Sequence, residues 1–168
     1  SAQRKKMSVI GVDFGNDSVY IAQAKRGGID LILNENTNRK NPCIVSFQGK
    51  ERFAGESASP LARSNYKNTI RCVKRLIGRD FDAPETQAEL ELLPFKTSKL
   101  EDGRVGIHVS YNDGELSLTC EAALGCILTK VKEIVAAENP GTRRPDIVMS
   151  VPGYFTDAMR RSTLDAVE

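Results

Sequence analysis

The residues best suited to chemistry stand near the start of the chain, where an apolar run ends in a carboxylate and a glycine. Residues 9–14 read VIGVDF, and Gly15 leads directly into small polar residues. A second apolar run at residues 19–24 follows, so the segment predicts a β-hairpin with Asp13 at the end of its first strand. Backbone N–H groups in such a turn can face an anion, and a carboxylate beside them suits the hard cation that accompanies phosphate. The alternative is an ordinary hairpin with a solvated Asp13, because short glycine motifs have many chance occurrences.

The other chemically capable side chains do not form a metal-binding pattern. The cysteines include no CxxC pair and the histidine is single: Cys43, Cys72, Cys120, Cys126 and His108. A zinc site is therefore not expected. Three of the four cysteines lie in apolar or helical contexts, which predicts buried, reduced thiols and a cytoplasmic location.

The composition is that of an ordinary globular protein. The 168 residues are 40% hydrophobic and 27% charged, with a net charge of +2. This length suffices for one domain with a core, or for a large part of a longer protein. Mixed charges and the absence of tryptophan do not favour nucleic acid, and no stretch reaches the length of a membrane span. We expect neither nucleic acid nor membrane among the partners.

Apolar periodicity and turn residues predict the elements that would position the carboxylate. Strands are predicted at residues 9–14, 19–24, 29–33, 44–47, 52–54, 105–111, 115–118 and 146–151. Helices are predicted as short pieces within 56–76, at 85–93, from the cap residue Thr119 to a stop at 139–141, and after the cap residue Thr156. The run at 146–151 is apolar almost throughout, which predicts a strand buried in a central sheet. The order predicts an α/β fold, a mixed sheet flanked by helices with an inserted α+β subdomain.

The two ends of the chain lead to further expectations. Residues 1–6 read SAQRKK before Met7, which suggests a non-native remnant or a short disordered basic arm. The helical pattern after Thr156 is still running at Glu168. We therefore expect the chain to be a fragment of a longer protein.

Three separated motifs resemble those of the seventy-kilodalton heat-shock chaperones. Residues 12–15 (VDFG) are similar to the first phosphate loop, residues 68–79 to the signature NT…KRLIGR, and residues 150–161 to the stretch TVPAYFND…QR. Residues 24–29 (AKRGGI) and 64–69 (SNYKNT) are similar to the larger, hundred-and-ten-kilodalton branch of the same superfamily. The resemblance covers essentially the whole chain.

The resemblance implies the actin-like, ribonuclease-H-like ATPase fold, of which this chain would supply the first lobe. Residues 7–42 and 118–168 would form the base subdomain of that lobe, and residues 43–117 its inserted upper subdomain. The second lobe and the substrate-binding domain would lie outside the chain. Because the nucleotide lies between two lobes in this fold, the chain alone is expected to bind ATP poorly.

The resemblance also assigns roles around the first turn. Asp13 would orient the water shell of Mg²⁺, a cation that keeps several waters and takes few carboxylates. Gly15, Asn16 and Asp17 would face the phosphates of ATP, and glycine lets the backbone approach an anion closely. Lys74 would be the catalytic lysine that contacts the γ-phosphate and helps place the attacking water.

Some of these residues also have plainer interpretations. Without the resemblance, Lys74 would belong to a solvated basic face formed with neighbouring arginines. Pro152 and Arg160 resemble a proline and an arginine that relay the nucleotide state to other domains. On their own they are a strand terminator and a surface charge on a helix.

The residues after the loop glycine depart from the family pattern. Hydrolysing members usually carry two hydroxyl residues there, whereas this chain has Asn16 and Asp17. An amide still donates a hydrogen bond to phosphate, but the hydroxyl donor is lost. Asp17 would repel the phosphates if it faced them and would be harmless if it capped the turn.

The resemblance to the larger branch implies an ATP-binding co-chaperone, a nucleotide-exchange factor and holdase with weak or absent ATPase activity. Its cofactors would be ATP and Mg²⁺, and its partners would be seventy-kilodalton chaperones and unfolded client polypeptides. The alternatives are a true ATP-hydrolysing chaperone with an unusual loop and a metabolite kinase of the same fold. The kinase needs a base for a sugar hydroxyl, and the sequence offers no candidate in the usual context.

Overall fold

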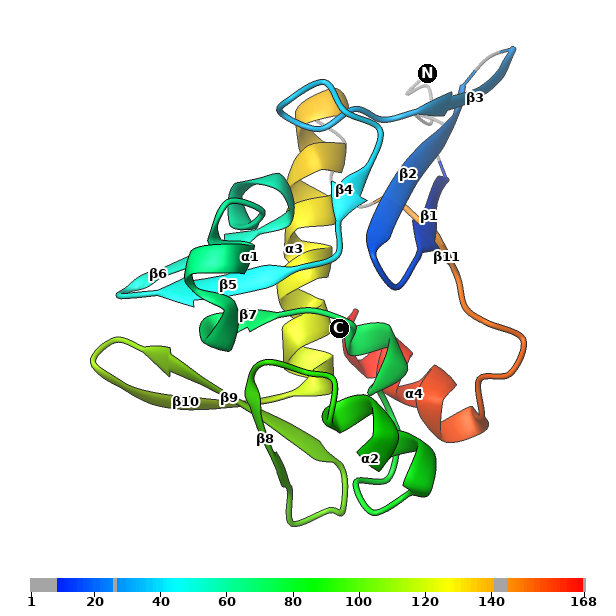
Figure 1. Cartoon of the computed structure of the whole chain (residues 1–168). Coiled ribbons are helices and arrows are strands. Elements are labelled where there is room, and N and C mark those ends of the chain that lie inside the picture. Colours follow the sequence, from blue (N-terminus) through cyan, green and yellow to red (C-terminus); the bar gives the residue numbers. More distant parts are fainter. Residues whose placement is uncertain (1–8, 26, 141–144, 168) are drawn as a thin grey trace.

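The computed structural model describes residues 9–25, 27–140 and 145–167. The expectation for residues 1–6 lies outside the described residues, as does the last position of the predicted helix stop at 139–141. Within the described part, no helix combines the length and hydropathy needed to cross a bilayer. Figure 1 shows a long central helix, α3 (Cys120–Glu138), with the main sheet towards the upper right and two smaller sheets towards the lower left.

The main sheet carries the predicted phosphate turn. Its strand order is β11-β1-β2-β3, with β4 also paired to β2. The strands are β1 (Ile10–Phe14), β2 (Ser18–Lys25), β3 (Gly28–Leu31), β4 (Asn41–Pro42) and β11 (Ile147–Ser150). β1 and β2 form the predicted antiparallel hairpin, whereas β1 and β11 run parallel. Because one face of β1 and β2 is buried, their apolar alternation sets the register of the pair.

The prediction that residues 146–151 form a strand buried in a central sheet is wrong about the burial of the strand. Among the described strands, β11 pairs with β1 alone and lies at the edge of the sheet. Ile147 and Val148 are 46% and 64% exposed. A continuous apolar run is consistent with burial on both faces, but it does not show whether other elements of the chain provide that cover.

Two three-stranded sheets lie between β4 and α3 in the sequence, with the orders β6-β5-β7 and β10-β9-β8. Their strands are β5 (Val45–Gln48), β6 (Glu51–Ala54), β7 (Thr69–Ile70), β8 (Lys96–Lys99), β9 (Val105–Tyr111) and β10 (Gly114–Thr119). The predicted hairpins β5–β6 and β9–β10 are confirmed. Strands β4, β7 and β8 were not predicted, because two of them have only two residues and β8 reads KTSK without apolar alternation.

The apolar face of α3 packs against the core that the sheets share. Its N-terminus is capped as predicted, since the Thr119 hydroxyl oxygen accepts a hydrogen bond from the Ala122 N–H at 3.1 Å. Its buried positions recur at helical spacing. The apolar ones belong to one core cluster: Cys120, Ala123, Leu124, Cys126, Ile127, Val131, Ile134 and Val135.

Short helices complete the chain. They are η1 (Gly55–Ala58), α1 (Leu61–Ser64), η2 (Tyr66–Asn68), η3 (Val73–Arg75), α2 (Pro84–Leu90) and α4 (Asp157–Asp165). The predicted cap of α4 is confirmed, because the Thr156 hydroxyl accepts from the Met159 N–H at 3.4 Å. The mixed sheet, its helices and the inserted α+β region confirm the predicted fold class, whereas the subdomain boundaries at 42/43 and 117/118 stay a prediction.

Candidate functional site

Asp13 lies at the end of β1, beside the end of β11. The parallel register pairs Asp13 with Ser150, so both residues reach the same edge of the sheet. The Ser150 hydroxyl donates a hydrogen bond to Asp13 Oδ1 at 2.8 Å. The Asp13 side chain is exposed, so its second oxygen remains available to solvent on this edge. Carboxylates at the ends of strands in α/β sheets are common ligand-binding groups.

Gly15 opens the turn between β1 and β2, and only glycine fits there. Its N–H donates to the Ser18 carbonyl oxygen at 2.9 Å. A Cβ atom at this position would lie 2.4 Å from that same oxygen. The backbone therefore folds back on itself too closely for any side chain, so this turn requires glycine.

Asn16 follows in the turn and contacts the segment that carries Lys74. Its Nδ2 donates to the Cys72 Sγ at 3.7 Å, while its Oδ1 is buried and has no partner among the described residues. A buried polar atom without a partner costs free energy unless water or a ligand satisfies it. The unsatisfied acceptor therefore fits a water molecule, such as one in the hydration shell of a cation.

Asp17 is turned into a local ion pair. Its Oδ2 accepts from the Ser18 hydroxyl at 2.9 Å and lies 2.8 Å from the Lys40 ammonium nitrogen. The hydrogen bond from Lys40 is the main reason that the pKa of the Asp17 carboxyl lies below its ordinary value. The Asp17 carbonyl also accepts from the Cys43 N–H at 2.8 Å. The carboxylate is thus paired with Lys40, while its effect on phosphate binding stays a prediction.

Lys74 reaches the same turn from η3. Its ammonium group donates to the Phe14 carbonyl oxygen and lies 5.4 Å from the centroid of the Phe14 ring. Cys72, which precedes η3, has a left-handed backbone with φ 60° that starts this short helix. Lys74 is half-buried, whereas Arg75 is exposed and pairs with Glu89 at 3.0 Å. The structure thus separates Lys74 from the solvated basic face, although its catalytic role stays a prediction.

Pro152 and Arg160 meet at the backbone of Phe155, away from the turn. The Pro152 carbonyl accepts from the Phe155 N–H at 3.1 Å, and the Arg160 Nε donates to the Phe155 carbonyl at 3.1 Å. The Phe155 side chain is buried in the core. These contacts connect the two predicted relay residues to each other, and no hydrogen bond among the described residues connects them to Asp13.

The thiols near the site differ in exposure. Cys43, Cys120 and Cys126 are buried and Cys72 is half-buried, and all four are free thiols, which confirms the predicted burial of three of them. Burial raises the pKa of Cys43 and of Cys120 to about 12. Cys72 is therefore the thiol closest to solvent.

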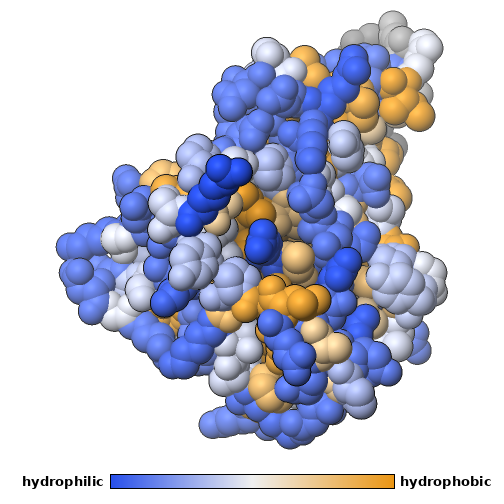
Figure 2. Space-filling model, viewed as in Figure 1, coloured by the Kyte–Doolittle hydropathy of each residue, from blue (hydrophilic) through white to orange (hydrophobic). Residues whose placement is uncertain are grey.

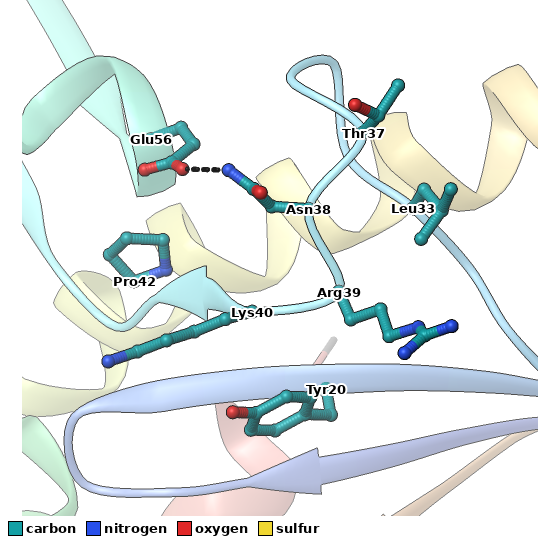
Figure 3. Close-up of a pocket in the computed structure, with 8 residues that line it drawn as sticks. All are labelled: Tyr20, Leu33, Thr37, Asn38, Arg39, Lys40, Pro42 and Glu56. Carbon is teal, nitrogen blue, oxygen red and sulfur yellow. Dashed lines mark hydrogen bonds between the residues drawn. The ribbon is translucent and has the colours of Figure 1, made fainter.

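Two hollows lie beside the turn. One of about 470 Å³ is lined by Asn16, Asp17, Lys40 and Cys72 together with residues of η3 and α2. Another of about 820 Å³ lies on the far side of Lys40, against Tyr20 and Arg39 (Figure 3). Figure 2 shows that this face of the molecule is mostly hydrophilic, with hydrophobic residues gathered near its middle. Charged, polar and apolar side chains line both hollows.

The donor set fits hydrated magnesium better than a directly bound transition metal. Among residues 9–25, 27–140 and 145–167, no group of three or more histidine, cysteine, aspartate or glutamate side chains could hold an ion. Asp13 offers a single oriented carboxylate. Mg²⁺ keeps most of its waters and needs few protein carboxylates, so one such group beside a phosphate turn is sufficient.

Three residues of the site were missed from the sequence. Ser150 was quoted only as part of a motif, although two strands that both end in polar residues are a signal that parallel pairing would bring those residues together. Lys40 and Cys72 approach the turn from loops distant in the sequence. No local pattern predicts those contacts, because each depends on how separate segments pack.

Comparison with known proteins shows that the chain is similar to heat shock proteins. The family model described as Hsp70 protein matches residues 9–168. Heat shock 70 kDa protein 16 of Arabidopsis thaliana is 43% identical over 160 residues, covering 95% of this chain and 21% of the relative. The 97 kDa heat shock protein of Strongylocentrotus purpuratus is 42% identical over 162 residues (96% and 18%), and heat shock protein 110 of Caenorhabditis elegans is 39% identical over 163 residues (96% and 21%). The chain spans about a fifth of the length of these curated relatives.

Proposed function

Because this chain belongs to the Hsp70 protein family, on the side of its larger 110 kDa branch, we propose that its full-length protein is an ATP-binding chaperone. We propose further that it acts as a nucleotide-exchange factor and holdase for Hsp70 chaperones in the cytoplasm. Its partners would be those chaperones and unfolded client polypeptides.

The state of the β1–β2 turn carries this proposal. Asn16 and Asp17 stand where hydrolysing relatives are expected to carry hydroxyl groups. Asn16 donates to Cys72 Sγ, the Ser18 hydroxyl donates to Asp17, and the Ser150 hydroxyl donates to Asp13. The turn therefore offers its main chain to a phosphate but no free side-chain hydroxyl, which favours a site that holds ATP and has lost part of the means of cleaving it.

The remaining contacts support a nucleotide role for the predicted residues. Asp13, oriented by Ser150, would hold the water shell of Mg²⁺, and the metal would neutralise charge on the phosphates. The backbone of Gly15 and Asn16 would face the phosphates. Lys74, already placed over the end of β1, would reach the γ-phosphate by leaving the Phe14 carbonyl.

A role in relaying nucleotide state is proposed for Pro152 and Arg160. Both are attached to the backbone of Phe155, whose ring is anchored in the core. A shift of the strand β11 that carries Ser150 would therefore reach α4 through a short covalent and hydrogen-bonded path.

Nucleotide release from an Hsp70 partner tests the proposal. A fluorescent ADP is loaded on the Hsp70, the full-length protein is added with excess ATP, and the release rate is measured. We expect acceleration that increases with the ratio of the two proteins, and no acceleration at any ratio would overturn the exchange role. The Lys74→Ala variant separates the alternative, because multiple-turnover hydrolysis that collapses in this variant would indicate an ATP-hydrolysing chaperone instead.

A further inference from the structure

Lys40 is the residue whose position the nucleotide roles above leave unexplained. It stands directly before β4 and extends its ammonium group to the turn between β1 and β2, 2.8 Å from Asp17 Oδ2. Figure 3 shows the side chain running towards the turn, while the neighbouring Arg39 points the opposite way. The side chains of these two adjacent residues therefore diverge. That of Lys40 is held towards the turn by its ion pair with Asp17.

The backbone around Lys40 is held on both sides. Before it, Asn34 Oδ1 accepts from the N–H groups of Asn36 and Asn38 at 3.0 and 2.9 Å, and Asn34 Nδ2 donates to the Lys40 carbonyl at 3.3 Å. After it, Asn41 Nδ2 donates to the Val19 carbonyl at 3.2 Å. Lys40 therefore projects from a rigid segment, and less conformational entropy is lost when its side chain pairs with Asp17 than for a lysine on a mobile loop.

Asp17 presents an electrostatic problem for a phosphate site. It lies in the turn whose main chain would bind the phosphates, two residues after Gly15. Its negative charge would repel a polyphosphate, and the repulsion grows with the number of charges on the ligand. A fixed cation on the Asp17 carboxylate cancels most of that field at the distance of the ligand.

We propose that Lys40 is a positioning residue of the nucleotide site. It holds the Asp17 carboxylate against the segment that leads into β4 and cancels its charge, so that the turn accepts the phosphates of ATP. The inference rests on the proposed ATP-binding function. It assigns Lys40 no contact with the nucleotide, because its ammonium group is already engaged by Asp17.

The exposure of the pair distinguishes this role from a stabilising one. The Lys40 and Asp17 side chains are 56% and 83% exposed. Exposed ion pairs contribute little to folding stability. Loss of Lys40 should therefore leave the unfolding transition almost unchanged and should act on the binding of anions.

Binding titrations on the full-length protein test the inference. We expect Lys40→Met to weaken ATP binding about three- to tenfold, and ADP binding less, because ADP carries less charge. Lys40→Arg should bind ATP like the unaltered protein. The Asp17→Asn, Lys40→Met double variant should recover the affinity of Asp17→Asn alone, and added salt should shrink the effect of Lys40→Met.

Lys96→Met is the matched control. Lys96 also forms an exposed ion pair, with Glu115 at 2.9 Å, but on β8 far from the turn. The Lys96→Met variant should leave ATP binding unchanged. The inference is overturned if Lys40→Met binds ATP normally, if ATP and ADP lose affinity equally, or if the double variant is not restored. If the unaltered protein fails to bind ATP, the proposed function and this inference are overturned together. If the unaltered protein binds ATP and Lys40→Met binds it equally well, only this inference is overturned.

Discussion

The chain contains two hairpin turns that look similar in sequence and are built in different ways. The β9–β10 turn consists of Asn112 and Asp113, both with positive φ (53° and 63°), followed by Gly114. This is the backbone of a tight two-residue turn. Its contact with a distant segment is made by the main chain, since the Asn112 N–H donates to the Gly49 carbonyl oxygen at 2.7 Å. The β1–β2 turn instead depends on Gly15 and on side chains that arrive from distant segments, including Lys40 and Lys74.

The difference shows where a binding site departs from a purely structural turn. A self-contained turn needs only residues that tolerate its dihedral angles. The β1–β2 turn gathers two lysines and two carboxylates around its main chain, and Asn16 Oδ1 is buried with no partner among the described residues. Charged side chains gathered at the end of a strand are typical of ligand-binding sites in α/β sheets.

The glycines of the two turns provide the largest expected contrast. Gly15→Ala would place a Cβ atom 2.4 Å from the Ser18 carbonyl oxygen, whereas the nearest atom to a Cβ at Gly114 lies at 3.9 Å. We expect Gly15→Ala to destabilise the protein by about 1–3 kcal/mol and to abolish measurable ATP binding. Gly114→Ala should change stability by less than about 0.5 kcal/mol. Denaturant unfolding and calorimetric titration measure both effects, and equal behaviour of the two variants would remove the distinction between the turns.

Replacement of Lys74 tests whether the lysine belongs to the site. Lys74→Ala removes a charge that lies over the end of β1, so ATP binding should weaken about tenfold. Lys67, which lies 5.9 Å from the Tyr66 ring and outside the site, provides the control. If Lys67→Ala and Lys74→Ala have the same effect on ATP affinity, Lys74 is only part of a basic surface.

Ser150 tests the orientation of Asp13. Ser150→Ala removes the 2.8 Å hydrogen bond to the carboxylate, and we expect ATP affinity in the presence of Mg²⁺ to fall about three- to tenfold. The loss should disappear when Mg²⁺ is chelated, because the serine acts through the metal-orienting carboxylate. Ser117→Ala, at an exposed position of β10, should show no loss with or without Mg²⁺. A loss that persists without Mg²⁺ would contradict the assigned role of Asp13.

The pH dependence of the turn is the smallest expected effect. Lys40 lowers the pKa of Asp17 below its ordinary 3.8, so the ion pair contributes stability above that value and loses it as the pH falls through the lowered pKa. In Lys40→Met, a carboxyl NMR titration should show the pKa of Asp17 moved upward. Lys96→Met should instead raise the pKa of Glu115, which Lys96 lowers, and leave Asp17 unchanged. If the pKa of Asp17 is unchanged in Lys40→Met, another group stabilises the carboxylate.

Sequence patterns predicted the parts of the fold that depend on neighbouring residues. The two-residue turn, the caps at Thr119 and Thr156 and the apolar spacing of α3 all involve contacts within a few positions, and the structure confirms them. The burial of β11 was mispredicted because burial depends on elements elsewhere in the chain. Strand β8 was missed because its residues are mostly polar and, among the described strands, it pairs with β9 alone.

The residues of the site also divide into those that a local pattern predicts and those that depend on packing. Asp13 and Gly15 were predicted because a strand end and a glycine are visible in one short segment. The contacts of Asn16 with Cys72 and of Asp17 with Lys40 span 56 and 23 positions and arise only when the loops pack on the hairpin. The sequence left open whether Asp17 opposes the phosphates, and the ion pair with Lys40 could not be predicted from it.

The fate of bound ATP distinguishes a site that retains the nucleotide from one that cleaves it. The full-length protein is incubated with Mg²⁺ and excess radiolabelled ATP, separated from free nucleotide, and the bound nucleotide is identified over several hours. Our account predicts that ATP is retained and stays mostly uncleaved, because the turn binds phosphate without free hydroxyl donors. Repeated turnover to ADP, or a failure to retain nucleotide, would contradict it.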